Sequence, residues 1–145
     1  MTLTPEDVRL VQTTFQQVRP HAEAAAGLFY DRLFALDPSL RPMFRGDMRT
    51  QGRHLMAALA FVTEGLSRPE TILPAVRDLG RRHAGYGVQD GHYATVGGAL
   101  LDTLAAFFGD AFTPEVREAW IRAYALLADE MMEAARAPAP VGGLR

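Results

Sequence analysis

Hydrophobic residues recur at intervals of three and four along most of the chain, and the strict alternation expected of β-strands is nearly absent. This periodicity predicts helices. Thr4-Pro5-Glu6-Asp7 and Thr113-Pro114-Glu115 mark two helix starts, because a capping hydroxyl precedes proline and acidic residues. The chain is therefore predicted to be all-α. About seven helices are expected, near residues 5–18, 21–36, 38–44, 48–66, 70–84, 91–108 and 114–136.

We expect one domain over residues 1–136 and a flexible tail over residues 137–145. The chain has 145 residues, of which 48% are hydrophobic and 22% charged, and this is enough to bury a single core. The stretch 137–143 consists of small residues, prolines and glycines, a composition that predicts a frayed end.

Charge and composition exclude several classes of function. The net charge is −2 and no basic stripe is present, so no nucleic-acid partner is expected. The sequence contains no run of 18 apolar residues that would predict a membrane span. The first residues do not resemble a signal peptide. We therefore expect a cytoplasmic protein. The absence of cysteine excludes disulfides, iron–sulfur clusters, cysteine-rich zinc sites and thiolate-bound haem.

The predicted helix over residues 70–84 carries one apolar stripe that ends in a histidine. Ile72, Val76, Leu79 and His83 share a helical face. A neutral imidazole in an apolar slot is the axial ligand that a haem iron takes. A capped or hydrogen-bonded histidine at a helix end is the structural alternative, and the stripe by itself favours that alternative.

The long helix over residues 48–66 offers a complementary face. Gln51, Leu55, Leu59 and Val62 follow helical spacing, with His54 at the edge of the stripe. Gln51 is either a hydrogen-bond donor inside a cleft or simply the point where the stripe meets solvent. If the two stripes oppose each other, they form a flat apolar cleft with one ligand and one donor, which suits a planar cofactor and a small gas.

Several motifs, in order, carry a family resemblance. They are Leu28-Phe29-Tyr30, Leu33-Phe34, Arg41-Pro42-Met43-Phe44, Leu79-Gly80-Arg81-Arg82-His83, Gly87-Val88, Tyr93-Ala94-Thr95-Val96-Gly97, and Phe112-Thr113-Pro114 through Trp120. Together they resemble the bacterial single-domain globins of the flavohaemoglobin type, and they are also similar to neuroglobins. The resemblance covers residues 4 to about 136 and implies a globin fold that sandwiches haem b, iron protoporphyrin IX.

The resemblance also implies a role for individual residues. It makes His83 the proximal iron ligand and Phe44 the wedge against the haem. Tyr30 and Gln51 would face the distal side, with Leu55 closing the space over the iron. The other residues implied to contact the cofactor are Leu79, Val88 and Val96 around the macrocycle, Tyr93 beside the proximal ring, and Arg53, His54 and Arg82 near the propionates. For Tyr30 the structural alternative is a core tyrosine whose hydroxyl donates to a backbone carbonyl.

One position departs from the family pattern. Flavohaemoglobin-type globins carry a glutamate late in the last helix, which pairs with the tyrosine near the proximal histidine and makes the imidazole a stronger electron donor. Counting from Trp120, the matching residue is Ala135, and Glu133 falls on another face of the helix. The missing carboxylate weakens the case for peroxidase-like or fast nitric-oxide chemistry.

Three functions follow from the resemblance. The first is reversible binding of O2, and of CO or NO, at a pentacoordinate iron, for oxygen binding, storage or delivery, with no catalytic residue. The second is a nitric oxide dioxygenase that depends on a separate reductase, because no flavin domain is expected. The third is a gas sensor. The protein is expected to be a monomer or a homodimer.

Overall fold

The structure is a computed structural model that describes residues 3–136, so the predicted tail over residues 137–145 lies outside the described residues. Its α-helices are α1 (Pro5–Val18), α2 (Ala22–Leu36), α3 (Met48–Gly65), α4 (Pro69–Gly85), α5 (Asp90–Phe108) and α6 (Pro114–Arg136). Short 3₁₀ segments are η1 (Arg19–His21), η2 (Pro38–Met43) and η3 (Gly109–Ala111). No strand occurs within residues 3–136, which confirms the predicted all-α class.

The predicted short helix over residues 38–44 is a 3₁₀ segment, η2, rather than an α-helix. Pro42 lies inside it and has no N–H to donate to a carbonyl four residues earlier. Phe44 then adopts an extended conformation, with φ −102° and ψ 102°. The tighter turn ends at this corner, and the chain enters α3 after Asp47 caps its first turn through a bond from the Arg49 N–H.

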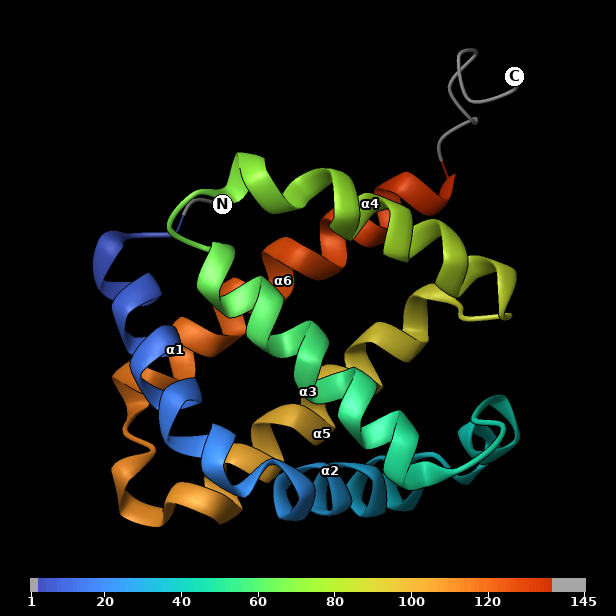
Figure 1. Cartoon of the computed structure of the whole chain (residues 1–145), viewed down its shortest axis with the longest axis horizontal. Helices are drawn as coiled ribbons and strands as arrows, with labels where there is room; N and C mark the ends of the chain where they lie inside the picture. The colour runs from blue at the N-terminus through green and yellow to red at the C-terminus, as the bar shows by residue number, and fades with distance from the viewer. Residues whose placement is uncertain (1–2, 137–145) are drawn as a thin grey trace.

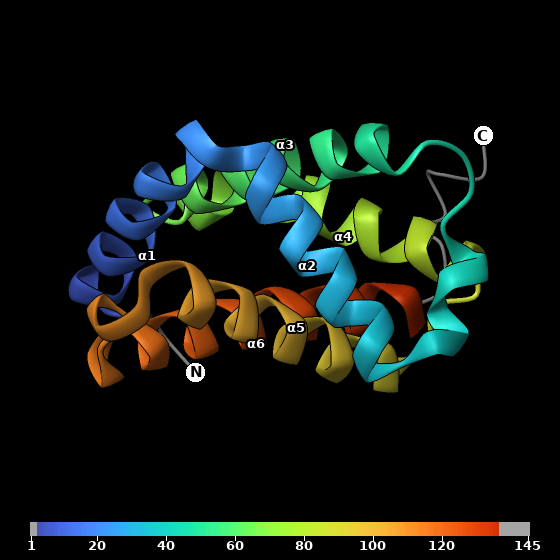
Figure 2. The same ribbon diagram turned by 90° about the horizontal axis from the view of Figure 1, so that it is seen from below.

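The helices form two layers that α1 and α2 connect (Figure 1). Figure 2 shows α3 and α4 on one side and α5 and α6 on the other, with α2 crossing between them. α4 packs mainly on α6, α2 packs on α5 and α3, and α1 packs on α6 and α3. No helix within residues 3–136 is both long and apolar enough to cross a membrane.

A single core joins α1, α2, α5 and α6. Phe15, Leu33 and Trp120 are among its largest buried side chains. The indole N–H of Trp120 donates to Thr14 Oγ1 at 2.8 Å, so the polar atom of this buried ring has a partner. The bond links α6 to α1 across the core.

A capping box of two reciprocal hydrogen bonds holds the first turn of α1. The side chain of Thr4 accepts from the Asp7 N–H, and Asp7 accepts from the Thr4 N–H. Asp7 also accepts two bonds from the Arg122 guanidinium on α6, at 3.0 and 3.1 Å. Asp7 is only 4% exposed, so this pair anchors α1 to α6 at the edge of the core.

Candidate haem site

His83 lies in the last turn of α4 and is half-buried. Its Nδ1 lies 2.8 Å from the Leu79 carbonyl oxygen, one turn earlier. A carbonyl can only accept, so Nδ1 carries the proton and Nε2 keeps its lone pair. Burial lowers the pKa of His83, and the nearby Arg82 guanidinium lowers it further. The imidazole is therefore neutral near pH 7 and oriented as metal-binding histidines usually are.

The apolar side chains that the resemblance assigns to the macrocycle share one degree of burial. The apolar side chains predicted to pack the macrocycle are half-buried rather than sealed in the core; they are Phe44, Leu55, Leu79, Val88 and Val96. Val88 also donates its N–H to the His83 carbonyl at 3.0 Å, which ties the following loop to the end of α4. A neutral imidazole with a free lone pair is the axial donor that an iron porphyrin takes from histidine.

Tyr30 on α2 lies inside an aromatic cluster. Its ring lies edge-on to Phe44 with 5.4 Å between centroids, and it stacks on Phe34 at 6.0 Å. Burial raises the pKa of Tyr30 to about 12. The phenol therefore remains protonated, and a hydrogen-bond donor, across the physiological range. The structure thus brings Tyr30 together with Phe44, the corner residue predicted to wedge the cofactor.

Both predicted distal donors are bonded to backbone carbonyls. The Tyr30 hydroxyl donates to the Gln51 carbonyl at 3.3 Å, which is long for an O–H donor. The Gln51 amide donates to the Arg45 carbonyl at 3.1 Å, in the loop before α3. For Tyr30, the bond to a carbonyl is the contact that the structural alternative requires. The two residues are nevertheless neighbours, because the Tyr30 hydroxyl touches the Gln51 backbone.

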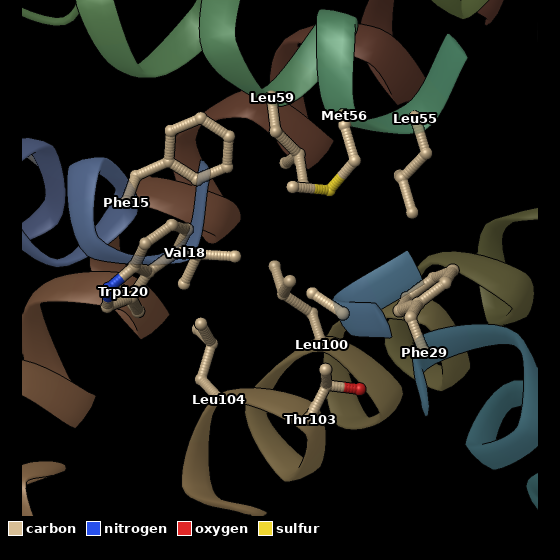
Figure 3. A pocket seen from close by; sticks show the side chains of 11 residues that line it. Phe15, Val18, Phe29, Leu55, Met56, Leu59, Leu100, Thr103, Leu104 and Trp120 are labelled. Atoms are coloured by element: carbon tan, nitrogen blue, oxygen red, sulfur yellow. The ribbon is translucent and has the colours of Figure 1, made fainter. Parts of the chain in front are cut away.

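Leu55 on α3 borders an internal apolar cavity of about 20 Å³ (Figure 3). The volume is sufficient for one molecule of about the size of water. The other lining residues are Phe15, Val18, Ala25, Phe29, Met56, Leu59, Leu100, Thr103, Leu104 and Trp120. The only hydroxyl among them, that of Thr103, donates to the Ala99 carbonyl at 2.7 Å, so the cavity offers no free donor. Sequence reasoning missed this cavity, since its walls come from five separate helices.

The residues predicted near the propionates are exposed. Arg53 donates to Thr50 Oγ1 at 3.1 Å, and His54, next to it on α3, is exposed. Arg82 forms an ion pair with Asp78 at 3.4 Å. These groups lie towards the N-terminus of α3 and the C-terminus of α4, the two ends that face the same side of the molecule in Figure 1.

Sequence reasoning missed Tyr124, which contacts the predicted site residue Tyr93. Its hydroxyl donates to the carbonyl of Tyr93 at 2.6 Å, and its ring lies against Gly97. The spacing of Tyr124 four residues after the buried Trp120 was the available signal. Burial raises the pKa of Tyr93, and the charge of Asp90 adds to this effect.

The departure at Ala135 is visible in the structure. Ala135 and Glu133 are both exposed, and the neighbouring Arg136 forms an ion pair with Asp90 at 2.5 Å. Within residues 3–136, the partner of His83 Nδ1 is the neutral carbonyl of Leu79 rather than a carboxylate. The imidazole therefore donates a hydrogen bond to a neutral acceptor, the weaker of the two kinds.

An all-α fold with an imidazole oriented for metal binding fits the class of haem-binding helical proteins. The globin family model matches residues 27–131, and the chain belongs to the globin family. This membership confirms the resemblance and implies a haem cofactor.

Named relatives agree with this assignment. The flavohemoprotein of Bordetella parapertussis is 36% identical over 138 residues, which cover 93% of this chain and 34% of the relative. The flavohemoprotein of Bacillus subtilis is 31% identical over 130 residues, which cover 88% of this chain and 33% of the relative. The chain therefore spans about a third of the length of these relatives.

Solved structures share the fold. An engineered carbene transferase derived from a Rhodothermus marinus protein, provisionally described as a nitric oxide dioxygenase, matches with a TM-score of 0.82 and 27% identity, covering 92% of this chain and 94% of that one. A bacterial globin from Campylobacter jejuni matches with a TM-score of 0.80 and 21% identity, covering 92% and 96%. These matches confirm the globin fold.

Proposed function

We propose that this chain binds haem b through His83 and reversibly binds O2, with CO and NO as further ligands. The observation that carries the proposal is the bond from His83 Nδ1 to the Leu79 carbonyl. It fixes the tautomer and leaves the Nε2 lone pair to a metal. When bound, the haem iron would supply the attachment point for the diatomic ligand.

The remaining roles belong to side chains of this chain. Half-buried apolar groups would hold the macrocycle and exclude water from it, and exposed hydrogen-bond donors, two of them arginines, would pair with the propionates. The proposed set is Phe44, Leu55, Leu79, Val88, Tyr93 and Val96 for the macrocycle, and Arg53, His54 and Arg82 for the propionates.

Tyr30 is the proposed principal donor to O2. Its phenol keeps its proton, and its present bond to the Gln51 carbonyl is long. An acceptor that carries negative charge competes well for such a donor, because a charge-assisted bond contributes roughly 1.5–3 kcal/mol. Gln51 would have to release the Arg45 carbonyl first, so we assign it the smaller share.

The second candidate is a nitric oxide dioxygenase. It is favoured by the similarity to the Rhodothermus marinus protein described above and by the flavohemoprotein relatives. Conversion of NO and O2 to nitrate consumes one electron, and we propose a separate reductase as its source. The neutral partner of His83 Nδ1 makes the imidazole a weaker electron donor, and on this ground we rank O2 binding first.

Haem loading of His83→Ala tests the proposal. This variant should lose its haem, or hold it only when imidazole is added, whereas His21→Ala at an exposed site should keep it. An unchanged visible spectrum and haem content in His83→Ala would show that another group binds the iron.

Stopped-flow mixing of the O2-loaded protein with NO separates the two candidates. With a reductant present, a dioxygenase turns over repeatedly, whereas an O2 carrier reacts once and recovers slowly. Sustained nitrate formation over many equivalents of NO would favour the second candidate.

A further inference from the structure

Gly80 brings the backbone of α4 directly against the backbone of α6. A methyl group added at Gly80 would lie 2.6 Å from Met131 Cα and 2.8 Å from its carbonyl carbon, and closer still to its carbonyl oxygen. Real side chains do not approach backbone atoms so closely. The neighbour is main chain and has no flexible end to move aside, so only a shift of one helix would make room.

This contact lies at the interface that holds α4 in place. α4 packs mainly on α6, and its buried residues Ile72, Val76 and Gly80 form a single stripe. The first two contribute branched side chains, and the third contributes none. Because Gly80 is the last member of the stripe, it sets how closely the C-terminal half of α4, which carries His83, approaches α6.

The direction of any shift at Gly80 is coupled to His83. Three residues along an α-helix rotate by about 300°, so His83 points about 60° away from the direction of Gly80. When α4 moves away from α6, His83 is therefore withdrawn along the direction in which its imidazole points, by roughly half the distance that the helix moves. Restoring ordinary contact with Met131 Cα requires roughly 1 Å of movement, which corresponds to about half an ångström at His83.

We propose that Gly80 is a positioning residue that sets how far His83 reaches towards the haem iron. The proposal rests on the proposed role of His83 as the iron ligand. Gly80 touches neither the cofactor nor the gas ligand in this role and acts through the seat of α4 on α6.

The test compares Gly80→Ala with Gly85→Ala in the haem-loaded ferrous protein. Gly85 ends the same helix, has no heavy atom within 4 Å of an added methyl group and has no positive φ. Gly80→Ala should lower the Fe–His stretching frequency in resonance Raman spectra. It should also change the O2 dissociation rate by roughly threefold to tenfold, since a 1 Å misplacement costs up to about 100-fold. Gly85→Ala should match the wild type in both measurements.

A second background separates positioning from general destabilisation. In His83→Gly with added imidazole, the iron ligand is no longer attached to α4, so adding Gly80→Ala should leave the O2 dissociation rate unchanged. A similar effect of Gly80→Ala in both backgrounds would overturn the proposal, as would a wild-type Fe–His frequency in the single variant.

If Gly80→Ala is too unstable to retain haem, the double variant Gly80→Ala/His83→Gly still tests the proposal. Haem recovery by Gly80→Ala/His83→Gly with imidazole supports the proposal, and failure of that pair overturns it. The proposed function fails separately, through full haem retention by His83→Ala with an unchanged spectrum.

Discussion

The hydroxyl of Tyr30 donates to the backbone carbonyl of Gln51 at 3.3 Å. This bond joins α2 to α3 through the two residues that are the predicted distal donors. The amide of Gln51 points elsewhere, to the Arg45 carbonyl. The two side chains are therefore unequal: one needs a small rotation to reach a new acceptor, and the other must leave a bond of ordinary length.

This inequality predicts different kinetics for Tyr30→Phe and Gln51→Leu. Tyr30→Phe should speed O2 dissociation by roughly tenfold or more, as the loss of a charge-assisted bond implies, and Gln51→Leu should have a smaller effect. CO dissociation should change much less in both, because bound CO carries little negative charge. Equal effects on the two gases, measured by stopped-flow ligand replacement, would instead indicate packing.

His54 should not bind the iron. It is exposed, and a rotation of α3 by about 100° would be needed to exchange it with Leu55. That rotation would expose the Leu55 side chain at a cost of roughly 1.5–3 kcal/mol. The ferrous protein should therefore be five-coordinate. Its visible spectrum should be the same in the wild type and in His54→Ala; a low-spin spectrum present only in the wild type would contradict this prediction.

Asp7→Asn should lower the melting temperature by a few degrees and make it less dependent on pH. The side-chain oxygen of asparagine can still accept from the Thr4 N–H, so the change isolates the charge pairing with Arg122. The hydrogen bond from Arg122 holds the pKa of Asp7 below its usual value. The stabilisation is therefore complete above the unfolded pKa of about 3.9 and is lost as the pH falls through the lower folded value.

Thermal unfolding of both proteins between pH 7 and pH 2 checks this sign. The difference between wild type and Asp7→Asn should be constant near neutrality and should shrink below about pH 4. A difference that grows on acidification would mean that the carboxylate is not the stabilising form.

Thr14→Val should destabilise the protein more than Thr103→Val. The first change leaves the buried Trp120 N–H without its acceptor, at a cost of about 1–3 kcal/mol. Thr103 donates only to the Ala99 carbonyl within its own helix, so its replacement leaves no buried donor unpaired. Denaturant unfolding of the two apoproteins measures the difference. Equal losses would show that the indole hydrogen bond is not the source.

Local sequence determined the helices. Capping residues such as Thr4, prolines at helix starts such as Pro114 and the apolar period act over a few residues. The observed bounds of α1 to α6 therefore lie within one or two residues of those predicted. The placement of His83 at the end of an apolar stripe was also predicted, because one helix carries the whole stripe. The helix type of η2 differed, since proline fixes a turn without specifying its hydrogen-bond pattern, and the short segments η1 and η3 were not predicted.

Tertiary structure decided the contacts between helices. Asp7 meets Arg122, Tyr30 donates to the carbonyl of Gln51 rather than to a free pocket, and the cavity beside Leu55 draws its walls from five helices. The backbone contact of Gly80 with Met131 depends on how closely α4 and α6 cross. Helical periodicity indicates which face of a helix is buried, but the depth and partner of that face depend on the joint packing of side chains distant in sequence.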